Sequence, residues 1–123
     1  MRLRYQLLPL LLASAACKMS TGPTNGGVTI QDFSFSPAAL TVKVGTTVKW
    51  TNSGPSAHTA TSNTGTWDSG QLSSPTSGGA YGGGTAGGTY QYTFTTAGTY
   101  PYHCSNHPPS TYPGFTGTIT VTP

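Results

Sequence analysis

The chain has 123 residues, of which 6% are charged, and its formal net charge is +3. This length allows a single domain with one modest core. Three of the five basic residues lie within the first 18 positions, and two aspartates balance the other two. The remainder is therefore nearly neutral, without the basic cluster that indicates nucleic-acid binding. Glu is absent and there are only three His. The chain therefore has too few acidic residues and histidines to form general acid–base pairs, and we do not expect an enzyme.

The N-terminus has the pattern of an export signal. Arg2 and Arg4 precede an apolar run, Leu7 to Leu12, that is too short to cross a bilayer. The run continues into Leu-Ala-Ser-Ala-Ala-Cys17, which resembles the lipobox of bacterial lipoproteins. We therefore expect residues 1–16 to be a signal peptide, Cys17 to be lipidated, and the protein to reside in the periplasm or cell envelope. Cleavage by an ordinary signal peptidase is the alternative, because Ser14 replaces the usual larger aliphatic residue.

Residues 17–27 are rich in Gly, Pro, Ser and Thr and predict a flexible tether. From Val28 to the C-terminus, short runs of β-branched and aromatic residues alternate with turn residues, and no helical periodicity is sustained. This pattern predicts an all-β domain over 28–123. The expected strands are a run from Val28 through Phe33 to Phe35, then 40–44, 47–51, 90–95, 99–103 and 116–121. The Gly-rich stretch within 73–88, most marked at 78–88, is expected to be a solvated surface loop.

Two segments carry residues with metal-binding chemistry. Cys104 and His107 stand three residues apart directly after a predicted strand, and His58 follows an earlier strand and a turn. A β-sandwich brings loops from distant strands together at one end, so these side chains can converge on one metal ion. A Cys-x-x-His pair also occurs in zinc sites, and a disulfide between Cys17 and Cys104 is a second alternative in an oxidising compartment.

Several segments, in this order, resemble the cupredoxin family, particularly its plastocyanin-like members. The matching pieces span Val28 to Val121 and are 30–37, 40–45, 48–52 leading to His58, 67–72, 94–100, the Cys104 to His107 loop and 117–121. The resemblance implies a Greek-key β-sandwich or barrel of about seven to eight strands. It also implies one type 1 (blue) copper ion, cycling between Cu(I) and Cu(II), held by His58, Cys104 and His107.

The chain departs from the family at the weak axial ligand, which is commonly Met. Its two methionines, Met1 and Met19, lie in the leader and the tether. Aligned on the closing strand 117–121, the Met position holds Phe115; counted from Cys104 it holds Tyr112. We favour Phe115, a non-ligating residue, with a weak contact from the Ala57 carbonyl as a further option. Loss of the axial donor predicts a raised reduction potential.

The remaining histidine, Asn52 and the large aromatic residues are not expected to bind the metal. His103 precedes Cys104 on a strand, so its side chain should point to the opposite face and not bind the metal. Asn52 is either a tie between ligand loops, as in the resembling family, or a turn residue. The large aromatic residues expected in the core are Trp50, Trp67, Phe33, Phe35 and Phe94.

We therefore predict an exported, monomeric one-electron carrier. Copper storage or delivery, and a degenerate cupredoxin acting as an interaction module, are the alternatives. Electrons should leave through His107, and a redox partner of unknown identity should dock on an apolar patch around it. The patch residues are Pro108, Pro109, Tyr112, Pro113 and Phe115. Because the domain has few charges, docking should depend weakly on salt.

Overall fold

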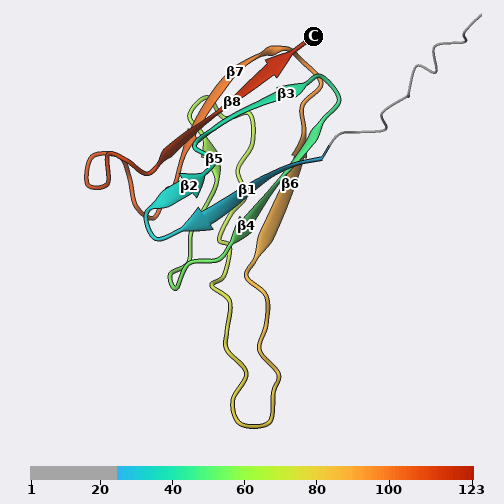
Figure 1. The fold of residues 1–123 in the computed structure, drawn as a ribbon. Coiled ribbons are helices and arrows are strands. Elements are labelled where there is room, and N and C mark those ends of the chain that lie inside the picture. The colour runs from blue at the N-terminus through green and yellow to red at the C-terminus, as the bar shows by residue number, and fades with distance from the viewer. Residues whose placement is uncertain (1–24) are drawn as a thin grey trace, which may run out of the picture.

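The computed structural model describes residues 25–123, and these form eight strands (Figure 1). In chain order they are β1 (Asn25–Gln31), β2 (Ser34–Ser36), β3 (Ala39–Lys43), β4 (Thr47–Asn52), β5 (Thr61–Ser62), β6 (Thr89–Thr93), β7 (Gly98–His103) and β8 (Thr116–Thr122). The all-β prediction is confirmed, and the fold is a Greek-key sandwich. The signal peptide, the lipidation site Cys17 and most of the predicted tether lie outside the described residues.

The strands form two four-stranded sheets, ordered β2-β1-β4-β6 and β3-β8-β7-β5. The β1–β4 and β3–β8 pairs are parallel, and the other pairs are antiparallel. The loops after β4 and β7 meet at one end of the sandwich, where the Ser105 N–H donates a hydrogen bond to Thr59 Oγ1. This arrangement supplies the two loops that carry His58, Cys104 and His107.

The core lies between the sheets and follows the two-residue period of the strands. In β8, Gly117, Ile119 and Val121 are buried while the intervening threonines are half-buried. Gly117 is required by packing, because a Cβ there would lie 2.3 Å from Cζ of the Tyr102 ring. Trp50 is fully buried and stacks on Trp67, with ring centroids 5.4 Å apart.

The first predicted run differs from the observed structure. β1 begins at Asn25, three residues before Val28, and the run is broken between Gln31 and Ser34. The Phe33 N–H donates to the Gln31 carbonyl at 2.9 Å, which closes a tight turn around Asp32. Phe33 has a φ of 100° and is 40% exposed. Its prediction as a core residue was therefore wrong, because the turn carries its ring to the surface. The other four predicted core aromatics are buried.

The Gly-rich segment between β5 and β6 runs out from the sandwich as a long narrow loop (Figure 1). Isolated bridges join Thr76 to Thr85 and Gly79 to Gly82, so the segment doubles back on itself. Tyr81 near the tip is fully exposed. The predicted surface position of this segment agrees with its exposure.

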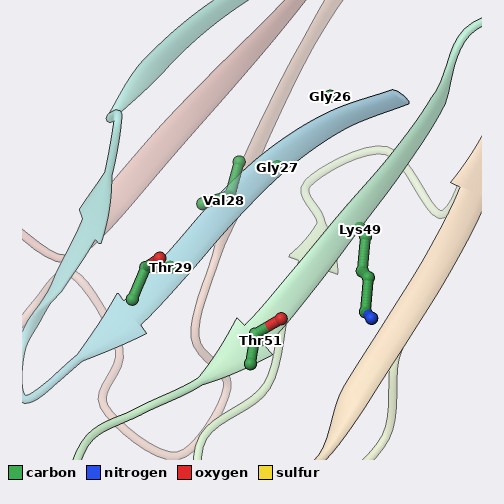
Figure 2. Close-up of a pocket in the computed structure, with 6 residues that line it drawn as sticks. All are labelled: Gly26, Gly27, Val28, Thr29, Lys49 and Thr51. Atoms are coloured by element: carbon green, nitrogen blue, oxygen red, sulfur yellow. The ribbon is translucent and has the colours of Figure 1, made fainter. Parts of the chain in front are cut away.

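A hollow of about 360 Å³ lies beside β1 and β4. Figure 2 shows that Gly26 and Gly27 border it without side chains, while Lys49 and Thr51 project from β4. None of the three candidate metal ligands lines this hollow. Residues 25–123 contain no helix long and apolar enough to cross a membrane.

Candidate metal centre

His58, Cys104 and His107 come together in the structure, although two loops supply them. The His58 N–H and C=O pair with Leu72 at 3.1 and 2.8 Å, which fixes the backbone of the first loop. Cys104 directly follows β7, and His107 lies in the loop to β8. His58 and Cys104 are fully buried, and His107 is half-buried. The site is therefore closed on one side and partly open on the other.

The three donor atoms form a nearly isosceles triangle. The Nδ1 atoms of His58 and His107 are 3.2 Å apart, and they lie 3.8 and 3.7 Å from Cys104 Sγ. The point equidistant from these atoms lies about 2.1 Å from each, which is close to metal–nitrogen and metal–sulfur bond lengths. A metal ion thus fits in or near the plane of the donors without movement of the backbone.

Phe115 closes the buried side of the site. It is fully buried, and its ring meets His58 edge-on with centroids 5.0 Å apart at an interplanar angle of 87°. The Phe115 ring lies 6.0 Å from that of His107. Phe115 was also predicted to belong to the exposed patch around His107, and that prediction was wrong because its ring is inside the domain.

On the exposed side of the site, the phenylalanine that lies beside His107 is Phe33 and not Phe115. The Phe33 ring stacks on Tyr112, with centroids 4.4 Å apart and an interplanar angle of 18°. Both rings approach the His107 ring, at 5.0 and 5.1 Å. The structure thus borders His107 with two aromatic side chains from separate turns.

Hydrogen bonds between the loops hold the donors in place. The Thr59 N–H donates to Cys104 Sγ at 3.3 Å, and the Ser105 N–H donates to Thr59 Oγ1 at 2.8 Å. Asn106 Nδ2 donates to the Ala57 carbonyl at 2.9 Å. That carbonyl, a candidate weak axial contact, therefore already accepts a hydrogen bond.

Asn52 ties the first loop to the strand that precedes it. Its Nδ2 group donates to the carbonyls of Ser56 and Leu72 at 2.8 and 2.9 Å, and its Oδ1 accepts from the Gly54 N–H at 3.0 Å. None of these bonds reaches the loop of Cys104 and His107, so of the two roles open to Asn52 from the sequence the structure shows the turn residue, which braces the His58 segment. His103 lies apart from the donor triangle, where its Nδ1 is 2.5 Å from Asn63 Oδ1.

Asp32 also belongs to this site, although it was not among the residues predicted from the sequence. Its Oδ1 lies 2.6 Å from Nε2 of His58, and its Oδ2 accepts a 2.8 Å hydrogen bond from Ser56 Oγ. Partial desolvation raises the pKa of Asp32, but hydrogen bonds from Ser56 and His58 and the charge of His58 outweigh it, so the pKa lies below its usual value. The sequence does contain a signal for this role. The chain has only two acidic residues, so each carboxylate is a candidate hydrogen-bond partner for one of the few histidines.

The comparisons with known proteins agree with this geometry. The family model for copper binding proteins of the plastocyanin/azurin family matches residues 23–122. The chain belongs to the plastocyanin/azurin family. Its fold and its His–Cys–His cluster make one copper ion the cofactor of this cupredoxin. No curated protein matches the chain.

Solved structures similar to this cupredoxin include a purple cupredoxin from Nitrosopumilus maritimus, at 25% identity and a TM-score of 0.58. That match covers 79% of this chain and 99% of the other. The reduced P94F mutant of amicyanin is 28% identical, with a TM-score of 0.54 and coverage of 85% and 87%.

A copper-containing nitrite reductase from Thermus scotoductus is also similar, at 25% identity and a TM-score of 0.61. The match covers 82% of this chain and 23% of that enzyme. The chain therefore corresponds to a minor part of the enzyme's length, and the likeness conveys the fold and no catalytic activity.

Proposed function

We propose that the protein is an exported, monomeric one-electron carrier, and that His58 Nδ1, Cys104 Sγ and His107 Nδ1 are its copper ligands. The observation that carries this proposal is the triangle of two nitrogens and one sulfur, in which an ion is about 2.1 Å from every donor. Copper bound there would supply one-electron exchange between Cu(II) and Cu(I). Two imidazoles and a thiolate are the donor set of blue-copper electron-transfer sites.

The surrounding residues favour rapid electron exchange because they leave the ligands little freedom. The backbone of His58 is paired with Leu72, and the Cys104 loop is bonded to Thr59 and Ala57 through Ser105 and Asn106. A change of oxidation state in such a frame moves few atoms. A small rearrangement lowers the barrier for passing an electron.

Phe115 is proposed at the axial position as a residue that donates no ligand atom. Its full burial and its ring contacts with both histidines support this assignment. Without an axial thioether, Cu(I) is favoured and the reduction potential rises relative to Met-ligated cupredoxins. A voltammetric potential at or below theirs would contradict the assignment.

We assign the electron port to the exposed side of His107. Residues 105–115 contain no charged side chain, and Pro108, Pro109 and Pro113 are exposed around the histidine. Together with Phe33 and Tyr112 they form an apolar surface for a redox partner. Exchange at this surface should change little with ionic strength.

Copper delivery is the rival function, and the burial of the site weighs against it. Handing copper to an acceptor requires ligand exchange at an accessible donor. Cys104 and His58 are fully buried, so only His107 could take part. Export and lipid anchoring at Cys17 remain proposals that rest on the leader sequence, and mass spectrometry of the mature N-terminus tests them.

The carrier and delivery functions can be separated with the copper-loaded protein. Electron self-exchange, measured from NMR line broadening in mixtures of the oxidised and reduced forms, should be rapid on the NMR timescale. The reduced form should retain copper when challenged with a Cu(I) chelator. Slow self-exchange together with prompt loss of copper to the chelator would support delivery instead.

A further inference from the structure

The turn between β1 and β2 places a carboxylate behind a histidine of the copper site. Asp32 Oδ1 lies 2.6 Å from Nε2 of His58, the ring nitrogen on the far side from the donor triangle. The same oxygen accepts the Ser56 N–H at 3.3 Å, and Oδ2 accepts Ser56 Oγ at 2.8 Å. Asp68, the other acidic residue, instead bonds Thr61 Oγ1 and the Gly70 N–H.

This contact determines which ring nitrogen of His58 holds the proton. An ionised carboxylate only accepts hydrogen bonds, so Nε2 must carry the proton. Nδ1 then presents a lone pair toward Cys104 Sγ and His107 Nδ1, as metal ligation requires. Nothing comparable holds the second histidine: within residues 25–123, Nε2 of His107 has no hydrogen-bond partner from the protein.

Two features of the neighbouring backbone accompany the position of the carboxylate. A Cβ on Gly54 would lie 2.7 Å from Asp32 Oδ1 and 2.8 Å from the Asp32 backbone nitrogen. Glycine at position 54 therefore leaves room for the carboxylate. On the other side, Phe33 adopts a φ of 100°, an uncommon value for a bulky residue, in closing the turn.

We propose that Asp32 is a positioning residue of the copper site, which fixes the tautomer of His58 and lowers the reduction potential through its negative charge. The proposal rests on the function proposed above, because it requires His58 to be a ligand. A negative charge hydrogen-bonded to a ligand stabilises Cu(II) more than Cu(I). Asp32 thus acts in the opposite direction to the missing axial donor.

The test compares Asp32→Asn and Asp32→Ala with Asp68→Asn, which removes the other carboxylate away from the site. Reduction potentials are measured by voltammetry on the copper-loaded proteins. Both Asp32 variants should lower the ratio of Cu(II) to Cu(I) affinity about tenfold, a positive shift of about 59 mV for a one-electron couple. Asp68→Asn should leave the potential at the wild-type value.

A second measurement needs no copper. In the apoprotein, ¹⁵N NMR of the imidazoles should show His58 with its proton on Nε2, and Asp32→Ala should give a mixture of both tautomers. Ser56→Ala keeps the Asp32–His58 contact while removing the hydroxyl donor, and should shift the potential less than Asp32→Asn. If either Asp32 variant fails to fold, Gly54→Ala, which displaces the carboxylate, should shift the potential in the same direction.

The possible results distinguish a failure of this proposal from a failure of the proposed electron-transfer function. Unchanged potentials in the Asp32 and Gly54 variants, with a single His58 tautomer in Asp32→Ala, would overturn the role of Asp32 while leaving the copper site intact. If Ser56→Ala shifted the reduction potential as much as Asp32→Asn, the role of Asp32 would be to support the loop structure and not to act through its charge. A wild-type protein that forms no copper–thiolate complex would instead overturn the proposed function.

Discussion

The two histidines of the proposed copper site lie in opposite surroundings. His58 is fully buried, its backbone pairs with Leu72, and its Nε2 is hydrogen-bonded to the Asp32 carboxylate. His107 is half-buried and lies against the rings of Phe33 and Tyr112. From this difference we infer that the two histidines have different roles. His58 sets the geometry and charge of the site, and His107 faces the redox partner.

Glycine substitution at each histidine should give the largest difference between the two positions. His107→Gly opens a gap at the surface, so free imidazole should enter and restore the visible absorption of the copper complex. His58→Gly leaves a closed cavity, costs about 2–5 kcal/mol of folding stability, and should not be rescued. The measurement is a titration of both copper-loaded variants with imidazole. Equal rescue would mean that the two sides are equally accessible.

Phe115→Met tests the closed side. A thioether at this buried position should favour Cu(II) about tenfold, which lowers the potential by about 59 mV. The cost in folding stability should be below about 1.5 kcal/mol, since the change roughly conserves an apolar volume. Voltammetry and thermal unfolding measure the two effects. A potential that does not fall would place the axial position elsewhere, with Tyr112→Met as the next variant.

Phe33→Asn and Tyr112→Ser test the open side. Each removes an aromatic ring beside His107, so electron self-exchange should slow several-fold while the potential changes little. Asn tolerates the positive φ at position 33, which limits the effect on folding. Tyr81→Ser, at the fully exposed tip of the Gly-rich loop, is the matched control and should not alter the rate. Unchanged rates in the first two variants would indicate another port.

The smallest effect on the copper site is expected from a change in the aromatic core. Burial raises the pKa of Tyr102 to about 12 from 10.0. Because the folded protein disfavours the phenolate, this contribution to stability is complete below pH 10 and is lost as the pH rises toward 12. Tyr102→Phe should remove that alkaline loss and leave the copper spectrum unchanged, as measured by unfolding at several pH values. A spectrum altered by the variant would tie the core to the site.

Much of the fold could be predicted from the sequence because its strands obey a simple period. Alternation in 116–121 placed β8 correctly to within one residue, and the order of the segments indicated the family. The cluster of His58, Cys104 and His107 followed from loops that a sandwich gathers at one end. Their role as ligands stays a prediction until the metal complex is measured.

The turn residues could not be predicted in the same way. The apolar run from Val28 to Phe35 suggested a core position for Phe33, whereas the observed turn around Asp32 interrupts the strand and reverses the chain. Asp32 was passed over because a lone acidic residue in a turn has no motif. Its partner, His58, lies 26 positions away and reaches it only through the parallel pairing of β1 with β4.

The central claim is that Cys104, with two histidines, binds copper in a type 1 site. Optical and EPR spectra of the copper-loaded protein test it most directly, with Cys104→Ala and His103→Ala as the paired variants. We expect an intense visible charge-transfer band and a small copper hyperfine splitting, both lost in Cys104→Ala and kept in His103→Ala. A wild-type protein that binds no copper, or a Cys104→Ala variant that keeps the band, would contradict it.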